Sequence, residues 1–368
     1  MKKIFVDVYL SFNFGDDLFL DILAKRFPHS QFTVNYVGEN YEEFLKRYPN
    51  VKRRTYTSVH KVMQRLKIKD TLTDYQSIAK EQDALVFIGG SIFREESFHE
   101  ALYADRLKMV QAFKALNKPV YIIGANFGPV KTQKFVEDYR RFYELCTDVC
   151  FRDQASYQIF QGMPNVRLAP DVIFSLDLEN YTVKTPLKRV GFSVIDVHHK
   201  EGLADREEAY LQSTMQTIEQ LTTEGYECWL LSFCANEGDT GVLHKLLERL
   251  PNSVKSHVKT YEYTGDIEAL ILLMSTFQMC VAARFHANII SLLLNVGIMP
   301  VIYSSKTTQM LKDLKLDHLL IEMDGLEQMH DEQTLRSAFN NKANIEQTKF
   351  DANRQFEALS KFIGQGND

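Results

Sequence analysis

Short apolar runs alternate with helix-like patterns along almost the whole chain. KIFVDVYL precedes GDDLFLDILAKRF, DALVFIGG precedes a helical pattern ending in KMVQAFKALN, and PVYIIGAN precedes KTQKFVEDYRRFYELC. A strand-like run followed by an amphipathic helix, repeated many times, is typical of βα units that build a mostly parallel sheet. The alternation therefore predicts an α/β fold with mostly parallel sheets.

The alternation is interrupted once, by the polar stretch LDLENYTVKTPLKR at residues 176–189, and it restarts with RVGFSVID. A chain of 368 residues is also of the right length for two domains of ordinary size. We therefore expect a first Rossmann-like domain at 1–177, a second at 188–328, and a helical segment at 329–368. In chains of this kind such a closing segment often packs back across the first domain.

Composition excludes some classes of partner. Apolar residues make up 45% of the chain and charged residues 25%, which is the profile of a globular protein. The net charge of −5 implies no general attraction to nucleic acid or to anionic lipid. We interpret a basic cluster at 52–69 as a solvent-exposed surface, and a peripheral contact with a membrane is the alternative.

The location expected from the sequence is cytoplasmic, with the inner face of the membrane as the alternative. The N-terminal MKKIFVDVYL reads as a strand rather than a signal peptide. The longest apolar run without charge, 287–303, contains Gly297 and Pro300, so no membrane span is expected. Five scattered cysteines indicate reduced thiols rather than disulfides or a metal site, and no metal is expected.

The loops that follow the strands carry the first candidate residues, because ligands of open α/β sheets bind beyond the carboxyl ends of the strands. SFNFGDD, GGSIFRE and GANFGPV are all rich in glycine and small polar residues. Glycine allows the backbone to approach a ligand closely, although each glycine alone could also mark an ordinary turn. Three such loops in one domain favour a ligand site.

Two adjacent aspartates, Asp16 and Asp17, begin the first helical pattern after Asn13 and Gly15. One carboxylate suffices to cap a helix. The other is a candidate to receive a sugar hydroxyl or to act as a general acid or base. Further along, Arg152 ends the strand DVCFR, where it could enter a ligand site or pair with a neighbouring carboxylate at the surface.

The segment VAARFHANII, residues 281–290, carries the strongest candidates. QMCVAA reads as a buried strand and HANIISLLLN as a buried helix, so Arg284 and His286 fall at the turn between them, at the rim of the core. A helix N-terminus, a guanidinium and an imidazole together favour a carboxylate or phosphate ligand. A structural Arg–His turn is the alternative, and Lys306 at the end of the next strand could add charge.

Several familiar motifs are missing from the sequence. It contains no GxxxxGK[ST], no HExxH and no GxSxG, and SFNFGDD lacks GxGxxG. P-loop nucleotide hydrolysis, zinc proteolysis, serine hydrolysis and ordinary dinucleotide binding therefore have no support.

From residue 4 to about residue 320 the chain resembles the polysaccharide pyruvyl transferases. The resemblance rests on NFGDDLFL, FIGGSIF, IIGANFGPV, FRDQASYQIF, LAPDVIF, ARFHANIIS and VIYSSK. The most specific of these is RFH, which resembles the family's Arg–Leu–His turn with Phe285 in the middle. The loops ANFGPV, FIGGSIF and SFCANEGD depart from the family pattern, and this bears on acceptor recognition more than on donor recognition.

The resemblance implies a GT-B-like fold in which two Rossmann-like domains face a cleft. It implies transfer of the enolpyruvyl group of phosphoenolpyruvate to two hydroxyls of one sugar in a polysaccharide or its precursor, with release of phosphate and no cofactor. The acceptor could be linked to a lipid. In the family the Arg and His of this turn contact the donor, which carries over to Arg284 and His286. The chemistry adds Lys306 and Arg152 as candidates for phosphoenolpyruvate, and His286 and Asp16 as candidates for acid–base catalysis. The candidates for the acceptor are Asn13, Gly15, Asp17, Gly89, Gly90 and Asn126.

Two other functions remain open at this point. A GT-B glycosyltransferase would share the fold and use Arg284 for a nucleotide diphosphate. A non-catalytic paralogue would bind a sugar or an anion without turnover. Oligomeric state is not visible in the sequence.

Overall fold

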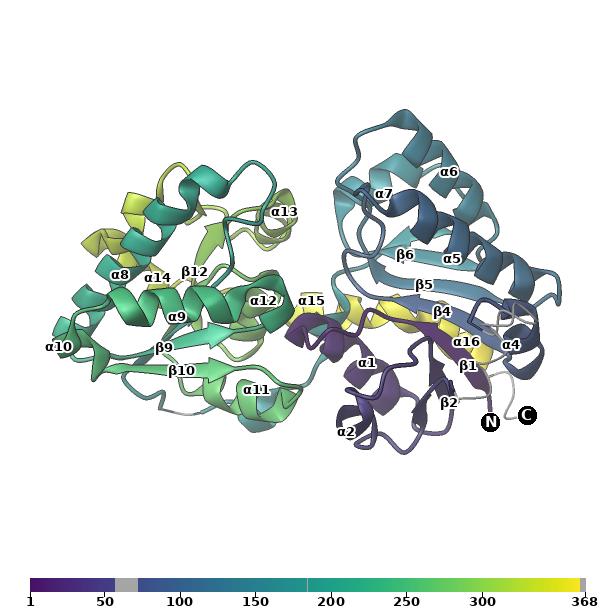
Figure 1. The fold of residues 1–368 in the computed structure, drawn as a ribbon, viewed down its shortest axis with the longest axis horizontal. Coiled ribbons are helices and arrows are strands. Elements are labelled where there is room, and N and C mark those ends of the chain that lie inside the picture. Colours follow the sequence, from purple (N-terminus) through teal and green to yellow (C-terminus); the bar gives the residue numbers. More distant parts are fainter. Residues whose placement is uncertain (57–71, 184, 365–368) are drawn as a thin grey trace. The chain divides into compact units, whose positions relative to one another are not determined.

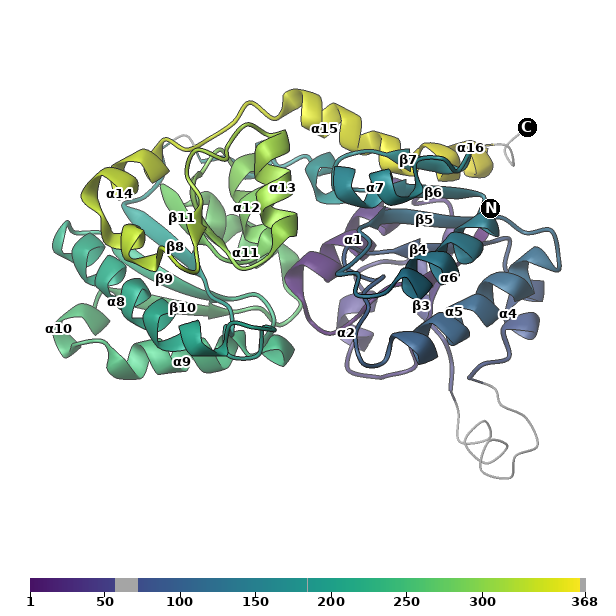
Figure 2. The same ribbon diagram turned by 90° about the horizontal axis from the view of Figure 1, so that it is seen from above.

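The structure is a computed structural model that describes residues 1–56, 72–183 and 185–364. It divides into two compact units, and each contains one sheet with helices on both faces (Figures 1 and 2). Unit 1 consists of Met1–Leu10, Phe19–Ser175 and Phe350–Asp368, and unit 2 of Ser11–Leu18 and Leu176–Lys349. The basic cluster expected at 52–69 lies mostly outside the described residues.

Unit 1 holds a seven-stranded sheet in the order β3-β2-β1-β4-β5-β6-β7. Its strands are β1 Lys3–Asp7, β2 Gln31–Val34, β3 Val51–Arg53, β4 Ala84–Ile88, β5 Val120–Ala125, β6 Asp148–Phe151 and β7 Val166–Leu168. Its helices are α2 Glu42–Leu45, α4 Tyr75–Glu81, α5 His99–Lys114, α6 Gln133–Glu144, α7 Gln154–Phe160 and α16 Glu357–Gly364. β4 and β5 are buried along their whole length because helices cover both faces of the sheet.

Unit 2 holds a six-stranded sheet in the order β10-β9-β8-β11-β12-β13. Its strands are β8 Arg189–Ser193, β9 Glu227–Ser232, β10 Val258–Glu262, β11 Met279–Ala282, β12 Gly297–Ile302 and β13 Ile321–Glu322. Its helices are α8 Glu207–Thr223, α9 Asp239–Arg249, α10 Asn252–Lys255, α11 Ile267–Ser275, α12 Phe285–Leu293, α13 Ser305–Asp313 and α14 Glu332–Phe339. Its core is mainly aliphatic, whereas the core of unit 1 contains many aromatic rings.

Both sheets have the strand order of a Rossmann fold, and the strand pairs recorded among the described residues are all parallel. The predicted α/β class with parallel sheets is thereby confirmed. In each sheet the strand order reverses at one place, between β1 and β4 in unit 1 and between β8 and β11 in unit 2. These switch points are where a ligand is expected in this fold.

Two segments, the start of α1 and the C-terminal segment, pack in a unit whose other residues are far away along the chain. Helix α1, Phe14–Arg26, starts in the segment that groups with unit 2 and continues in unit 1. Helix α15, Glu346–Ala352, leads from unit 2 into the C-terminal segment, which packs on the sheet of unit 1 (Figure 2). There the buried Gln355 side chain accepts a hydrogen bond from the Gly124 amide at 2.9 Å and donates to the Ala169 carbonyl at 2.9 Å.

Candidate active site

The turn between β11 and α12 lies at the switch point of unit 2. β11 ends at Ala282 and α12 begins at Phe285, so the predicted strand, turn and helix are confirmed. The Arg284 amide donates to the Ser193 hydroxyl, 3.1 Å away, at the end of the neighbouring β8. The buried Asn288 amide group donates to the carbonyls of Ala282 at 3.2 Å and Arg284 at 3.1 Å. These bonds hold the turn from both sides.

Arg284 is buried rather than exposed at the rim of the core, which corrects the expectation from sequence. Only 7% of the residue is exposed. Its guanidinium forms a two-bond pair with Asp239, with Nε 2.9 Å from Oδ2 and Nη2 on Oδ1. Nη1 donates to Oε2 of Glu237 at 2.5 Å. The anionic partner that a buried guanidinium requires is therefore supplied by the protein itself.

Glu237, two residues before α9, and Asp239, the first residue of α9, are functional candidates that the sequence did not single out. Asp239 is completely buried, and its Oδ2 also accepts the amides of Phe233 and Cys234 at 3.1 and 3.0 Å. Burial raises the pKa of Glu237, but the charge and hydrogen bond of Arg284, with help from Lys200 at 3.4 Å, lower it to about 2. The two carboxylates together balance the charges of Arg284 and Lys200.

The segment Ser11–Leu18 brings predicted residues from the start of the chain to this turn. Gly15 lies directly against the imidazole of His286, since a Cβ built on Gly15 would be 1.6 Å from Nδ1. Asn13 accepts the Gly15 amide on Oδ1 at 3.0 Å and donates from Nδ2 to Oε1 of Glu237 at 3.0 Å. Asn13, Gly15, His286 and Arg284 therefore form one connected group in unit 2.

The two predicted aspartates of this segment have different surroundings. Asp17 is completely buried and its Oδ2 accepts the hydroxyl of Tyr263 at 2.7 Å. Asp16 is partly exposed. Phe14 packs its ring against Phe233 and Tyr263, with ring centres 5.1 and 5.3 Å apart, which anchors the segment. Asn13, rather than either aspartate, caps the helix by accepting the Gly15 amide.

Lys306 lies in the first turn of α13, which follows the next strand of the same sheet. β11 and β12 are paired in parallel, so α12 and α13 both start at the same edge. The Nζ atom of Lys306 is 5.6 Å from the centre of the Phe285 ring. The structure thus places Lys306 beside the start of α12.

The other predicted residues gather in unit 1, around Arg152. Its Nη1 donates to Oδ2 of Asp171 at 2.7 Å, and its Nη2 donates to Oδ1 of Asn126 at 2.6 Å. A Cβ on Gly90 would be 2.3 Å from Nη1 of Arg152, so the glycine lets the guanidinium lie against the backbone. Gly89 and Gly90 follow β4 at the switch point of this sheet. Arg152 is buried and paired with Asp171, so of its two alternatives the surface pair is wrong.

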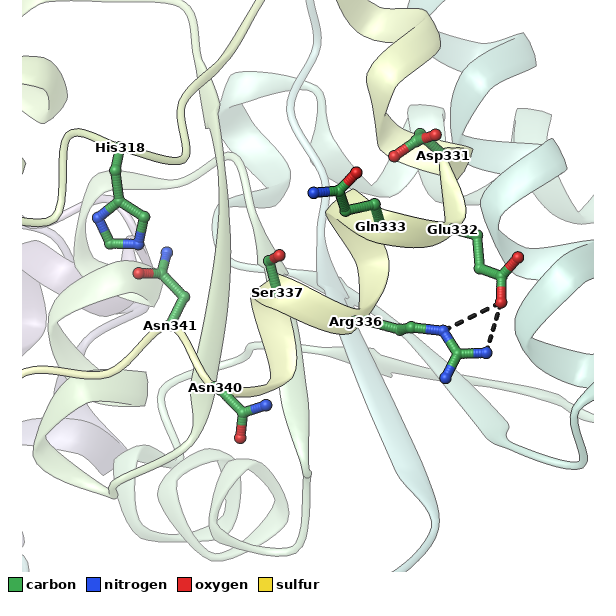
Figure 3. Close-up of a pocket in the computed structure, with 8 residues that line it drawn as sticks. All are labelled: His318, Asp331, Glu332, Gln333, Arg336, Ser337, Asn340 and Asn341. Carbon is green, nitrogen blue, oxygen red and sulfur yellow. Dashed lines mark hydrogen bonds and ion pairs between the residues drawn. The ribbon is translucent and has the colours of Figure 1, made fainter.

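A hollow in unit 2 lies apart from all these predicted residues (Figure 3). It has a volume of about 750 Å³ and is lined by His318, Asp331, Glu332, Gln333, Arg336, Ser337, Asn340 and Asn341. Asp331 caps α14 by accepting the Thr334 amide at 2.9 Å, and Arg336 pairs with Glu332. Asn341 instead donates to the Ile298 carbonyl of β12 at 2.9 Å, so these side chains have structural partners and we assign the hollow no chemistry.

Two further observations concern the described part of the chain. No cluster of at least three His, Cys, Asp or Glu side chains there could hold a metal ion. None of its helices combines the length and the apolar character needed to cross a bilayer.

Solved structures with a similar fold cover nearly the whole chain. HepE from Anabaena, solved in complex with UDP and glucose, matches with a TM-score of 0.64 and 13% identity, over 99% of this chain and 100% of that one. TarM matches with a TM-score of 0.59 and 10% identity, over 100% of this chain and 99% of that one. These structures are GT-B glycosyltransferases, and the similarity confirms the expected GT-B-like fold class.

Sequence comparison identifies the family. The amylovoran biosynthesis protein AmsJ from Erwinia amylovora is 22% identical over 284 residues, which cover 71% of this chain and 66% of AmsJ. The matched region thus spans just under two thirds of that relative. Residues 13–305 match the model of the polysaccharide pyruvyl transferases, a range that includes Asn13, Gly15, Arg284 and His286. The chain belongs to the polysaccharide pyruvyl transferase family.

Proposed function

We propose that the protein transfers the enolpyruvyl group of phosphoenolpyruvate to two hydroxyls of one sugar, in a polysaccharide or its precursor. Membership of the polysaccharide pyruvyl transferase family carries this proposal. The position of Arg284 and His286 at a sheet switch point supports it, because ligands of this fold bind there. The similarity to AmsJ, named for amylovoran biosynthesis, supports a polysaccharide acceptor.

The donor carries a carboxylate and a phosphate, so its site requires positive charge. The charge of Arg284 is already balanced by Asp239 and Glu237. Its three bonds to these carboxylates leave two of the five guanidinium N–H groups to donate to a donor oxygen. In this proposal Arg284 orients the donor through these N–H groups, and His286 and Lys306 contact its remaining oxygens.

The chemistry requires one proton donor and one base. Protonation of the methylene carbon of phosphoenolpyruvate makes a cationic centre, which the first sugar hydroxyl attacks. The second hydroxyl then displaces phosphate. The two hydroxyls release two protons in all: one makes up for the proton added to the methylene carbon, and the other leaves with phosphate. We propose His286 and Asp16 for these proton transfers, since both belong to unit 2 and Gly15, next to Asp16, lies against the His286 ring.

The remaining predicted residues are proposed for acceptor recognition. Asn13 and Gly15 lie beside His286, where an attacking hydroxyl has to be held. Asp17 fixes this segment through Tyr263. In unit 1, Gly89, Gly90 and Asn126 offer backbone and amide groups at the switch point. Arg152, which donates to Asn126, stays our candidate for phosphoenolpyruvate.

The test is to incubate the purified full-length chain with phosphoenolpyruvate and a panel of sugar acceptors, without nucleotide. Phosphate release that depends on the acceptor, together with an acceptor mass increased by a pyruvyl ketal, is the expected result. Arg284→Ala and His286→Ala should each reduce turnover or donor affinity by roughly tenfold or more, because each loses a charge-assisted contact. Lys255→Ala is the matched control, since Lys255 lies on α10 and, among the described residues, its side chain donates to the Glu248 backbone carbonyl alone.

Two results would contradict the proposal. One is transfer from a nucleotide sugar with no use of phosphoenolpyruvate, which would instead indicate a glycosyltransferase. The other is parental activity in both the Arg284 and the His286 variants.

A further inference from the structure

A histidine and a carboxylate form a pair in the loop that follows β8, at the switch point of the sheet of unit 2. Nδ1 of His199 is 2.7 Å from Oδ2 of Asp196, and the His199 amide donates to Oδ1 of the same side chain at 3.4 Å. Since a carboxylate only accepts hydrogen bonds, Nδ1 is the donor. In the neutral ring the lone pair then lies on Nε2, so this pair, the His199 dyad, favours the tautomer that can accept a proton there.

The two members of the His199 dyad differ in burial. Only 7% of Asp196 is exposed, and the backbone of Gly238 lies against its carboxylate, since a Cβ built on Gly238 would be 2.4 Å from Oδ2. The φ of Gly238 is +89°, a conformation that favours glycine. The side chain of His199 is 76% exposed. A carboxylate held by the backbone thus orients an imidazole whose Nε2 a substrate can reach.

The dyad lies beside the residues that bind Arg284. Gly238 separates Glu237 from Asp239 in the chain. Both of these carboxylates pair with the guanidinium of Arg284. Because the Asp196 carboxylate packs on the backbone between them, the dyad belongs to the same group of side chains as the candidate active site of unit 2.

The loop is also held on the other side of His199. The ammonium of Lys200 donates to Oε2 of Glu237 at 3.4 Å and lies 5.5 Å from the centre of the Tyr303 ring, just after β12. The Lys200 amide donates to the Val197 carbonyl at 3.1 Å. These contacts fix the backbone on which the imidazole of His199 stands.

The neighbouring His198 is less well oriented. Its Nδ1 is 3.3 Å from Oε2 of Glu207, the first residue of α8, and the same carboxylate pairs with Lys245 at 2.5 Å. A carboxylate shared with a lysine holds an imidazole less strictly than one that bonds to it at 2.7 Å. The geometry therefore favours His199 over His198 as a base.

We propose that His199, oriented by Asp196, is a general base for the acceptor, a role that rests on the proposed function. Ketal formation adds a proton to the methylene carbon and removes one from each sugar hydroxyl. His286 and Asp16 exchange the proton added at carbon for that of the first hydroxyl, and the proton of the second hydroxyl still has to reach phosphate. The His199 dyad carries this second proton.

The step balances in atoms and electrons. As the second hydroxyl oxygen bonds to the ketal carbon, its O–H bond breaks and the proton passes to Nε2 of His199. The C–O bond to phosphate breaks, and its electron pair goes to phosphate. Phosphate then takes the proton from His199, which returns the ring to its neutral form.

The kinetic test uses the full-length chain with phosphoenolpyruvate and the sugar acceptor that it turns over. His199→Ala should lower kcat by about a hundredfold or more, because general base catalysis contributes that much. The KM for phosphoenolpyruvate should stay near the parental value, since the base does not bind the donor. Added imidazole should restore part of the lost turnover, which a purely structural role of the side chain would not explain. Asp196→Asn should also lower kcat, because an amide allows the other tautomer.

His244→Ala is the matched control. His244 is another exposed histidine of unit 2 beside a carboxylate, with Nε2 3.7 Å from Oε1 of Glu262. It lies on α9, outside the group around Arg284. Its replacement should leave kcat at the parental level, with no response to imidazole.

The tautomer of His199 tests the dyad without any turnover. In protein labelled with ¹⁵N-histidine, the signals of His199 are those that disappear in His199→Gln. At alkaline pH the proton of the neutral ring should lie on Nδ1 in the parent. In Asp196→Asn it should move toward Nε2, because the carboxylate that holds it is gone.

The outcomes separate the dyad from the proposed function. Parental kcat with phosphoenolpyruvate in His199→Ala would overturn the dyad and leave the proposed function intact. A proton on Nε2 of the neutral His199 ring in the parent would overturn the dyad whatever the donor. Transfer from a nucleotide sugar but not from phosphoenolpyruvate, with a loss in His199→Ala that imidazole restores, would support the base and refute the proposed function.

Discussion

Arg284 illustrates how one buried charge organises its surroundings. Its guanidinium is held by Asp239 and Glu237, and Glu237 is tied in turn to Asn13. Removing one partner of a buried pair costs more than the pair contributes, because the remaining charge is left in a region of low polarity. The loop that carries Glu237 and Asp239 should therefore matter for stability as much as Arg284 itself.

Replacement of Asp239 tests this at the scale of one residue. Asp239→Asn keeps the shape but removes the charge that pairs with Arg284, so the free energy of unfolding should fall by about 3–5 kcal/mol. Urea denaturation at neutral pH measures the change. The control is Glu208→Gln, which alters an exposed pair with Arg249 at 2.8 Å and should leave the stability nearly unchanged. Equal effects of the two substitutions would contradict a stabilising role for the buried pair.

The lowered pKa of Glu237 should make the stability of the protein depend on pH. Its pKa is about 2 in the folded protein, against an ordinary value of 4.5. Because the folded state lowers this pKa, the stabilisation by Glu237 is fully present above about pH 4.5 and is lost as the pH falls toward 2. The unfolding free energy of Glu237→Gln should therefore vary less with pH than that of the parent over this range. Parallel pH profiles in urea denaturation would show that Glu237 is not the group responsible.

At the scale of elements, the start of α1 belongs with unit 2 although most of α1 belongs to unit 1. Ring contacts of Phe14 with Phe233 and Tyr263 fix this start, and Gly15 then lies against His286. The start of α1 thus limits the positions that the His286 ring can take. Only a residue without a side chain fits at position 15.

Gly15→Ala tests this contact. The added Cβ would be 1.6 Å from Nδ1 of His286, so the ring would have to move. Displacement of a reacting group by about 1 Å can lower turnover roughly hundredfold, and we expect a loss of that order for the proposed pyruvyl transfer. Gly241→Ala in α9 is the control, because no atom lies within 4 Å of its added Cβ, and its turnover should stay at the parental level. Parental activity of Gly15→Ala would contradict a role for the ring position.

Several elements of this site could be predicted from the sequence. β11 is a short apolar run and α12 a longer one, and the two polar residues between them mark the turn. The partners of Arg284 could not be predicted, because Asp239 is 45 residues away along the chain and local patterns carry no information about such contacts. The SFCANEGD loop gave one usable signal, namely two carboxylates just after a buried strand. For the same reason, the pattern predicted α1 but not the unit on which its first turn packs.

At the scale of the whole molecule, the sheet of unit 1 is completed by a segment from the other end of the chain. Gln355 is buried and bridges β5 to the residues that follow β7, through Gly124 and Ala169. It also donates to the Phe151 carbonyl of β6 at 3.3 Å. One side chain therefore satisfies backbone groups from separate parts of the sheet.

Gln355→Leu should weaken unit 1 selectively. The leucine leaves the Gly124 amide and the Ala169 carbonyl buried without partners, at a cost of about 1–3 kcal/mol for each group. Hydrogen exchange measured by mass spectrometry should show faster exchange in β5–β7 and unchanged exchange in β8–β12. The exposed Gln161 provides the control substitution, Gln161→Leu, which should leave both patterns as in the parent. Equal acceleration in both sheets would contradict separate stability of the two units.

The position of Gln355 also has a consequence for synthesis on the ribosome. Residues 1–175 contain the seven strands of unit 1, but the segment that completes their hydrogen bonding begins at residue 350. Domains generally fold as they emerge, and the partners of unit 2 have all been translated by residue 349. We therefore expect unit 2 to complete its fold before unit 1. Until the segment from residue 350 is translated, the backbone groups of unit 1 that bind Gln355 remain hydrogen-bonded to water.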